Sequence, residues 1–202
     1  ALVTDAGTPG ISDPGAVVVD VLHEAGVKVV PVPGASAVIA ALSVSGITEN
    51  GFSFIGFLPA SGSQRRKALE MHKAASHTLV FYEAPHRIVD CIVDMATILG
   101  GERRITVARE LTKTFETIHR CALNDAQAWI EDDPNQQRGE FVLLVEAAPP
   151  KEESAVSEDA EQKLKILLAE LPLKQAVKLA TEMTDAKKND LYQLALTLKG
   201  NT

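Results

Sequence analysis

Four short segments, each at the end of an apolar run of strand length, constrain this chain most. Each supplies Gly, Pro or small polar residues that turn the backbone sharply and expose its N–H and C=O groups. Loops of this kind at strand ends form the clefts in which α/β proteins bind small molecules. The segments cover residues 4–9, 31–37, 56–59 and 82–87, and read Thr-Asp-Ala-Gly-Thr-Pro, Pro-Val-Pro-Gly-Ala-Ser-Ala, Gly-Phe-Leu-Pro and Tyr-Glu-Ala-Pro-His-Arg.

Residues 1–50 alternate strand and helix patterns, as half of a parallel βαβ sheet does. We expect strands at 1–4 and 27–32, and helices at 16–25 and 37–44. Gly26 would stop the first helix, and Ser36 would cap the start of the second. Because the chain opens on an apolar strand with no initiating Met and no polar lead-in, we expect a fragment that lacks the start of its first domain.

The rest of the chain predicts a second mixed α/β domain at 51–147, a linker at 148–157 and a helical module at 158–202. In the second domain we expect strands at 52–57, 78–82, 105–108, 115–121 and 141–146, and helices at 63–75, 86–99 and 124–131. The module reads as three short amphipathic helices at 158–170, 173–183 and 188–198. Their spacing is typical of a helix-turn-helix-like unit.

Composition excludes several classes of protein. No apolar stretch among the 202 residues approaches the roughly 20 that a membrane span requires, so we expect a soluble protein. Cys91 and Cys121 lie in apolar patterns without CxxC spacing or His partners. We therefore expect reduced, buried cysteines and a cytoplasmic protein. No cluster of residues has metal-ligand spacing, and the absence of a GxGxxG motif argues against a dinucleotide-binding enzyme.

The net charge of −7 argues against broad attraction to nucleic acid, so any RNA site must be local. Between residues 161 and 202, however, seven Lys stand against five acidic residues. This change of sign favours RNA contact over a purely structural tail. Each short basic run is open to a second interpretation as an ordinary solvated face. With 4% aromatic residues, an extended base-stacking platform is not expected.

Two charged motifs leave alternatives open. His86, beside a Pro at a helix start, is either a catalytic base or a cap and hydrogen-bonding group. The segment 108–113, Ala-Arg-Glu-Leu-Thr-Lys, follows a strand and places three charged side chains close together. Because burying unpaired charges is costly, these residues form either a salt-linked structural corner or a site.

The order and spacing of the four junctions resemble the tetrapyrrole-methylase superfamily, whose members use S-adenosylmethionine. The block Ala-Arg-Glu-Leu-Thr-Lys-Thr-Phe-Glu at 108–116, the strand Gly-Glu-Phe-Val-Leu-Leu-Val-Glu at 139–146 and the helical tail are similar to one branch of it. That branch methylates a ribose 2′-hydroxyl of a cytidine in small-subunit ribosomal RNA. The resemblance implies a two-domain α/β methyltransferase with a truncated N-terminal domain and a helix-turn-helix-like extension.

The resemblance also implies a cofactor, partners and roles for particular residues. S-adenosylmethionine would lie between the first two domains, and the partners would be ribosomal RNA or the small subunit and a second copy of the chain. Cofactor contacts would come from Asp5, Ala6, Gly7, Thr8, Ser36, Ala37, Tyr82, Ala108 and Phe141. From their basic character, and not from the resemblance, we expect RNA contacts at Arg65, Arg66, Lys67, Arg87, Lys187 and Lys188.

The catalytic residues implied are Arg109, Glu110 and Lys113. Arg109 and Lys113 would hold an RNA phosphate or stabilise the forming alkoxide, and Glu110 or Glu116 would accept the ribose proton. Two rival functions remain: methylation of a tetrapyrrole or another small molecule on the same fold, and RNA binding without catalysis. The helical tail and the segment 109–113 argue against the first.

Overall fold

The computed structural model describes residues 1–5, 7–48, 51–149 and 156–200. It divides into two compact units, Ala1–Pro149 and Pro150–Thr202. Most of the expected linker at 148–157 falls on residues 150–155, outside the described ranges. The expected domain boundary near residue 50 stays a prediction, and in this structure the first unit contains residues from both sides of it.

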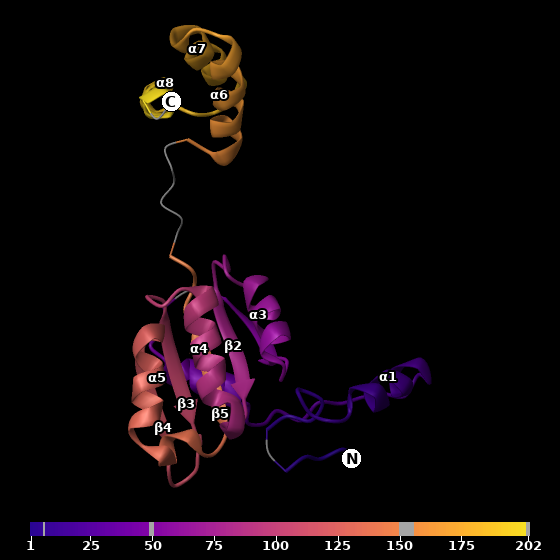
Figure 1. Ribbon diagram of the computed structural model, residues 1–202. Helices are drawn as coiled ribbons and strands as arrows, with labels where there is room; N and C mark the ends of the chain where they lie inside the picture. The colour runs from indigo at the N-terminus through magenta and orange to yellow at the C-terminus, as the bar shows by residue number, and fades with distance from the viewer. Residues whose placement is uncertain (6, 49–50, 150–155, 201–202) are drawn as a thin grey trace. The chain divides into compact units, whose positions relative to one another are not determined.

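A five-stranded sheet forms the centre of the first unit, in the order β1-β2-β5-β3-β4 (Figure 1). Its strands are β1 (Phe52–Phe57), β2 (Thr78–Glu83), β3 (Arg104–Arg109), β4 (Thr117–Ala122) and β5 (Phe141–Val145). β1 and β2 run parallel, whereas β5 is antiparallel to both of its neighbours and β4 is antiparallel to β3. All five residues of the central strand β5 are buried, which explains why its sequence is continuously apolar.

Helices cover both faces of this sheet. On one face α3 (Gly62–Glu70), α4 (Ile88–Leu99) and α5 (Leu123–Asp132) bury the larger core, which includes Phe81 and Leu143. On the other face α2 (Ala37–Val44) packs Val38 and Ala41 against strand residues. Short 3-10 helices, η1 (Pro85–Arg87) and η2 (Pro134–Gln137), follow β2 and α5. Figure 1 shows α4 and α5 lying in front of the strands.

The strands expected at 1–4 and 27–32 are absent from the described part of the chain, so that prediction is wrong. A strand requires a neighbour that completes its ladder of hydrogen bonds, and the sheet takes all five of its strands from residues 52–145. α1 (Ala16–Glu24) forms as expected but buries none of its residues. Side chains flanking it are also open to solvent, with Val32 86% exposed.

The remaining elements follow the sequence pattern, with shifts at their ends. The helix expected at 63–75 ends at Glu70, and the strand expected from 115 begins at Thr117. Pro85 lacks a backbone N–H, and a 3-10 turn precedes the helix expected from 86. None of the helices in the described ranges is long and apolar enough to cross a membrane.

The second unit consists of α6 (Glu158–Glu170), α7 (Leu173–Met183) and α8 (Lys188–Gly200), close to the three expected helices. Ser157 caps α6, its side chain accepting a hydrogen bond from the Ala160 amide at 3.2 Å. The helices share a core of small and branched side chains: Val156, Ala160, Leu164, Ala176, Val177, Ala180, Leu191 and Ala195.

Candidate functional site

One edge of the sheet collects most of the segments singled out in the sequence. β1, β2 and β3 end at this edge, and β4 and β5 begin there, as their pairing directions require. The loops after β2 and β3 and the turn before β5 are therefore neighbours. Two hydrogen bonds join the loop after β3 to the turn before β5. The Glu110 amide donates to the Glu140 carbonyl at 3.0 Å, and the Glu140 amide donates to the Glu110 carboxylate at 2.9 Å.

Near this edge, a row of side chains faces α2. Tyr82 of β2, Val142 of β5 and Ala108 of β3 stand in register across three neighbouring strands. Ala108 and Val142 pack with Val38 of α2, and the Tyr82 ring packs against the same cluster. Burial raises the pKa of the Tyr82 hydroxyl, although a hydrogen bond to the Val38 backbone opposes the shift. The structure thus brings Tyr82, Ala108 and the start of α2 together.

The loop at residues 5–8 joins the start of α2. Thr8 Oγ1 donates to the Ala35 carbonyl at 3.1 Å, and Gly7 adopts a φ of 70°, which favours glycine. Asp5 is exposed, and Ala6 lies outside the described residues. Ser36 is extended and its side chain makes no capping hydrogen bond. Small residues beside a helix start allow a ligand to approach backbone N–H groups closely.

Phe141 is the exception among the expected cofactor residues. It pairs in register with Glu83 and Arg109, on the face of the sheet that α4 and α5 cover, and its side chain belongs to that core. Since successive side chains of a strand point to opposite faces, Val142 takes the place facing α2. To find this from the sequence, the register of β5 against β2 and β3 would have been needed.

Arg109, at the end of β3, is only 8% exposed. Its guanidinium donates from Nε to the Arg138 carbonyl at 2.7 Å and from Nη1 to the Phe115 carbonyl at 3.1 Å. These bonds tie the loop after β3 to the turn before β5. Arg109 therefore positions the loop at residues 110–116.

Lys113 lies on that loop between two carboxylates. Its Nζ donates to Glu110 Oε1 at 2.8 Å and to Glu140 Oε2 at 2.9 Å. Two hydrogen bonds hold the pKa of the Glu110 carboxyl below its ordinary value. The bond from Lys113 has the larger effect, and the bond from the Glu140 amide has the smaller one. The same two carboxylates raise the pKa of Lys113. These ion pairs form the salt-linked corner that the sequence analysis gave as one of two interpretations of residues 108–113. The Lys113 side chain nevertheless remains 47% exposed, so a ligand can reach it.

Close packing and an unusual backbone accompany this corner. Glu110 and Thr112 have φ values of 50° and 66°, in the left-handed region that non-glycine residues seldom adopt. Gly139 has a φ of 93°, and a Cβ added there would lie 2.5 Å from Glu110 side-chain atoms. Only glycine therefore fits at residue 139 without displacement of the Glu110 side chain.

The expected RNA-binding residues divide into buried and exposed groups. Arg65 is buried and its Nε lies 2.7 Å from Asp94 Oδ2, which links α3 to α4. Arg66 reaches the same carboxylate at 3.2 Å but stays half exposed. Lys67, Lys187 and Lys188 are exposed. Burial makes Arg65 unsuitable for contact with an RNA phosphate, whereas the exposed residues remain accessible.

The turn after β2 depends on Glu83, a residue that the sequence analysis did not select. Its buried Oε1 accepts from the Ala84 amide at 2.7 Å and from Arg87 at 2.8 and 2.6 Å. Burial and the Glu83 carboxylate raise the pKa of the Cys91 thiol. Arg87 is thus engaged in fixing the turn, and His86 lies exposed on it. The four-residue spacing of Glu83 and Arg87 around a Pro was the available signal.

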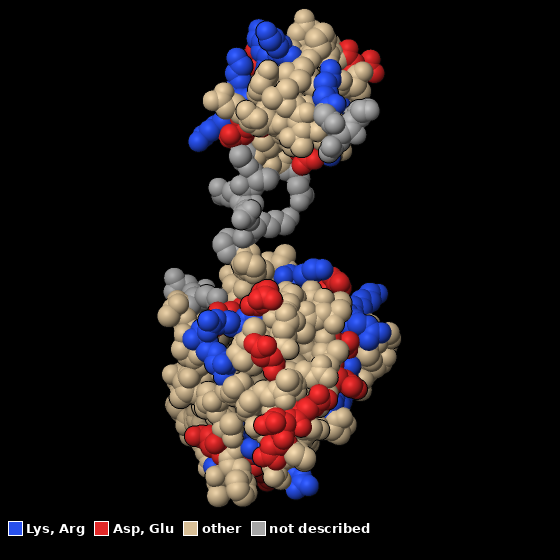
Figure 2. Space-filling model, turned by 60° about the vertical axis from the view of Figure 1, so that its left-hand side comes forward, with Lys and Arg blue, Asp and Glu red and all other residues tan. Residues whose placement is uncertain are grey.

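Charge is unevenly distributed over the first unit. Figure 2 shows Asp and Glu side chains extending across one face, with Lys and Arg nearer its margins.

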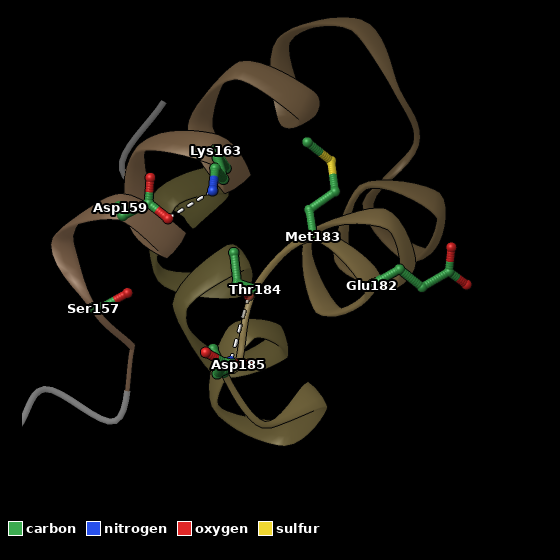
Figure 3. A pocket seen from close by; sticks show the side chains of 8 residues that line it. Ser157, Asp159, Lys163, Glu182, Met183, Thr184 and Asp185 are labelled. Carbon is green, nitrogen blue, oxygen red and sulfur yellow. Dashed lines mark hydrogen bonds and ion pairs between the residues drawn. The ribbon is translucent and has the colours of Figure 1, made fainter.

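A hollow of about 620 Å³ in the second unit is lined mainly by polar and charged residues, including Asp159, Lys163, Glu182 and Asp185 (Figure 3). Lys163 is paired with Asp159 at 2.7 Å, so the hollow has more negative than positive charge and is unfavourable for phosphate.

Comparison with known proteins identifies the family. The model described as Tetrapyrrole (Corrin/Porphyrin) Methylases matches residues 1–127, and that described as RsmI C-terminal HTH domain matches residues 154–199. The protein named Ribosomal RNA small subunit methyltransferase I from Pseudomonas aeruginosa is 49% identical over 203 residues, covering 100% of this chain and 72% of the relative. Its namesake from Escherichia coli O157:H7 is 48% identical over 200 residues, covering 99% and 70%.

The chain belongs to the tetrapyrrole methylase family, in the branch of these relatives. Solved structures agree with the tetrapyrrole methylase fold: the methyltransferase CobJ matches with a TM-score of 0.53 and 22% identity over 70% of this chain and 62% of its own. Cobalt precorrin-4 methyltransferase CbiF matches with a TM-score of 0.51 and 16% identity over 69% and 61%. The expected fold class, the methyltransferase class and S-adenosylmethionine as methyl donor are confirmed by this membership.

Proposed function

We propose that this chain transfers a methyl group from S-adenosylmethionine to small-subunit ribosomal RNA, at the ribose 2′-hydroxyl of a cytidine. The observation that carries this proposal is the 49% identity to a ribosomal RNA small subunit methyltransferase that extends over the whole chain. The relation includes the helical unit, which matches the C-terminal domain of the same branch. A tetrapyrrole substrate would leave that unit without a role.

The start of α2 is the place where the cofactor would bind. Ser36 makes no capping bond there, and Gly7 and Ala37 add no bulk, so a polar ligand end can approach backbone N–H groups. The partly buried ring of Tyr82 provides a small apolar surface alongside, whereas Ala108 is fully buried and would only support this surface from below. When bound, S-adenosylmethionine supplies an electrophilic methyl group. Asp5, Ala6 and Thr8 complete the proposed contacts.

The chain's own residues would then align the ribose and stabilise the negative charge that forms on its 2′-oxygen. We assign Lys113 to an RNA phosphate or the forming alkoxide, because its side chain is 47% exposed at the edge where β3 ends. Arg109 acts by positioning the loop, since its guanidinium is buried on two carbonyls. The lowered pKa of Glu110 makes it a weak proton acceptor, so its main role would be to hold Lys113.

Exposed cations of each unit would also hold RNA. Arg66 and Lys67 of α3 and Lys187 and Lys188 of the helical unit suit phosphate contacts that position RNA without reading its sequence. Because the proposed substrate is ribosomal RNA, we propose that the protein acts in the cytoplasm. We also propose that the chain pairs with a second copy, and the exposed valines of α1, Val17, Val18 and Val21, support such an interface. Sedimentation analysis tests the pairing.

Methyl transfer from a labelled donor to isolated small subunits tests the substrate. We expect label in ribosomal RNA, and mass spectrometry of the digested nucleosides should identify 2′-O-methylcytidine. Label in a porphyrinoid instead would favour the small-molecule rival, and RNA binding without label would favour the non-catalytic one.

Variants of Lys113 test its assignment. Lys113→Ala should lower the rate by about ten-fold, as loss of a transition-state charge contact does. Lys73→Ala is the matched control, because Lys73 is an exposed lysine that lies 3.9 Å from a glutamate carboxylate, that of Glu70. Equal rates for both variants would remove Lys113 from the site.

A further inference from the structure

Phe115 is exposed on the loop at residues 110–116, which is otherwise held firmly in place. Its side chain is 68% exposed, the largest exposed fraction among the aromatic residues in the described ranges. Single exposed apolar side chains are common on protein surfaces, so the meaning of this ring depends on the loop and the hollow beside it.

Several bonds fix the loop in the conformation that presents this ring. The Phe115 carbonyl accepts from Arg109, the Thr112 amide donates to Glu116 Oε2 at 2.6 Å, and the Glu116 amide donates to the Lys113 carbonyl at 3.1 Å. The positive φ of Thr112 adds strain that this network sustains. Strained backbone persists where the surroundings hold it, and it clusters at ligand sites. The loop is thus a preorganised support for Phe115.

A hollow of about 740 Å³ lies beside the ring, within the size range of small-molecule sites. Besides Phe115, its lining includes three acidic residues, two amide residues and two arginines: Glu110, Glu116, Asp133, Asn135, Gln136, Arg109 and Arg138. The carboxylates of Glu110 and Glu116 are already bonded to Lys113 and to the Thr112 amide. Aromatic rings stack on bases, and carboxylate and amide groups pair with base edges. Asp133 Oδ1 already accepts from the Asn135 amide at 2.8 Å, which sets the start of η2 and the position of the carboxylate.

We propose that this hollow receives the base of the acceptor nucleotide, stacked on Phe115, with its exocyclic amine donating to Asp133. The assignment rests on the proposed function, which supplies the RNA and the cytidine. A carboxylate accepts hydrogen bonds only, so it favours the amine of cytosine and disfavours the carbonyl of uracil at the same position. Arg109 follows Ala108 at the end of β3, so the base site and the proposed cofactor surface lie at the same edge of the sheet.

Stacking is tested by binding, without any need for cofactor. The probe is a short single-stranded RNA carrying either one cytidine or an abasic nucleotide at the same position between identical flanks. The unaltered chain should bind the cytidine RNA about ten-fold more tightly than the abasic one, the order of one stacked base. Phe115→Ala should remove this difference, and Phe115→Tyr should retain it. Phe52→Ala is the control, because Phe52 is an exposed aromatic at the opposite end of the sheet, where β1 begins.

Base selection is tested with Asp133→Asn, since Asn also caps a helix start and can donate to a carbonyl. The unaltered chain should prefer cytidine to uridine in the same RNA, and Asp133→Asn should reduce or reverse that preference. Thermal melting of each variant verifies folding.

The outcomes separate this inference from the proposed function. The stacking site is supported if the unaltered chain binds the cytidine RNA more tightly than the abasic RNA and Phe115→Ala binds the two equally. A difference that survives in folded Phe115→Ala would overturn it while leaving RNA methylation intact. Failure of the unaltered chain to bind either RNA, or equal binding of both, would overturn the base site. The proposed function is tested separately, by methyl transfer to isolated small subunits.

Discussion

At the scale of single residues, the Glu110 carboxyl gives a direct test of the corner. Its pKa lies below the ordinary 4.5 because Lys113 and the Glu140 amide donate to the charged form. A lowered pKa contributes stability that is present above the ordinary value and is lost as the pH falls through the folded value. Carbonyl-carbon NMR titration should place the midpoint below 4.5, and Lys113→Ala should raise it. An unchanged midpoint in that variant, with Lys73→Ala as control, would contradict the pairing.

Gly139 allows a second prediction at this scale. Gly139→Ala combines an unfavourable φ of 93° with a Cβ placed 2.5 Å from Glu110 atoms, so we expect a loss of about 2 kcal/mol or more in unfolding free energy. Gly100→Ala, at a φ of 102° with nothing within 4 Å, should show the smaller backbone cost alone. Urea denaturation compares the two. Equal losses would mean that the contact with Glu110 contributes nothing.

The resemblance implied Ser36, Tyr82 and Ala108 as cofactor contacts. The structure brings Tyr82, Ala108 and the start of α2 close together, while their role in cofactor binding stays a prediction. The sequence could not show that Arg65 is buried and Arg66 is half exposed. Both are arginines on one predicted helix, and their burial depends on how that helix packs beside Asp94. Whether a charge is buried depends on packing between elements distant in sequence.

At the scale of elements, Arg65 and Arg66 predict unequal effects on the joining of α3 to α4. Both reach Asp94, but the Arg65 side chain is 6% exposed and the Arg66 side chain is 50% exposed. Arg65→Ala leaves a buried carboxylate short of its main partner and should cost about 3 kcal/mol, whereas Arg66→Ala should cost under about 1 kcal/mol. Thermal unfolding of the two variants measures the difference, and equal costs would refute the buried pairing.

The secondary structure of residues 52–145 was largely predictable, because period-two and helical patterns there coincide with burial. The prediction of strands at 1–4 and 27–32 was wrong because the apolar pattern there does not coincide with burial. A β-branched run states only that a segment suits a strand, and the strand forms when a neighbouring backbone accepts its hydrogen bonds. Strand order was beyond the sequence as well, since β5 enters between β2 and β3, which precede it in the chain.

At the scale of the whole molecule, the two units predict separable functions. Removing residues 150–202 deletes Lys187 and Lys188 with the helical core, so RNA affinity should fall and depend less steeply on salt. The first unit keeps its own core, so its melting temperature should change by no more than a few degrees. Binding of the same RNA across a salt series, with circular dichroism for folding, decides the matter. An unchanged salt slope would make the tail a structural appendage.

The pairing of Lys113 has a consequence for how RNA would be admitted. Glu110 is largely enclosed, whereas the Glu140 side chain is 80% exposed, so the second of the two carboxylates is the one an incoming phosphate can replace. Until that exchange occurs, the ammonium is balanced and attracts passing anions weakly. A phosphate can therefore bind Lys113 only by displacing the Glu140 carboxylate. This requirement favours an RNA strand whose phosphate lies at the right position over any other anion, so Lys113 would contribute to selectivity more than to long-range attraction.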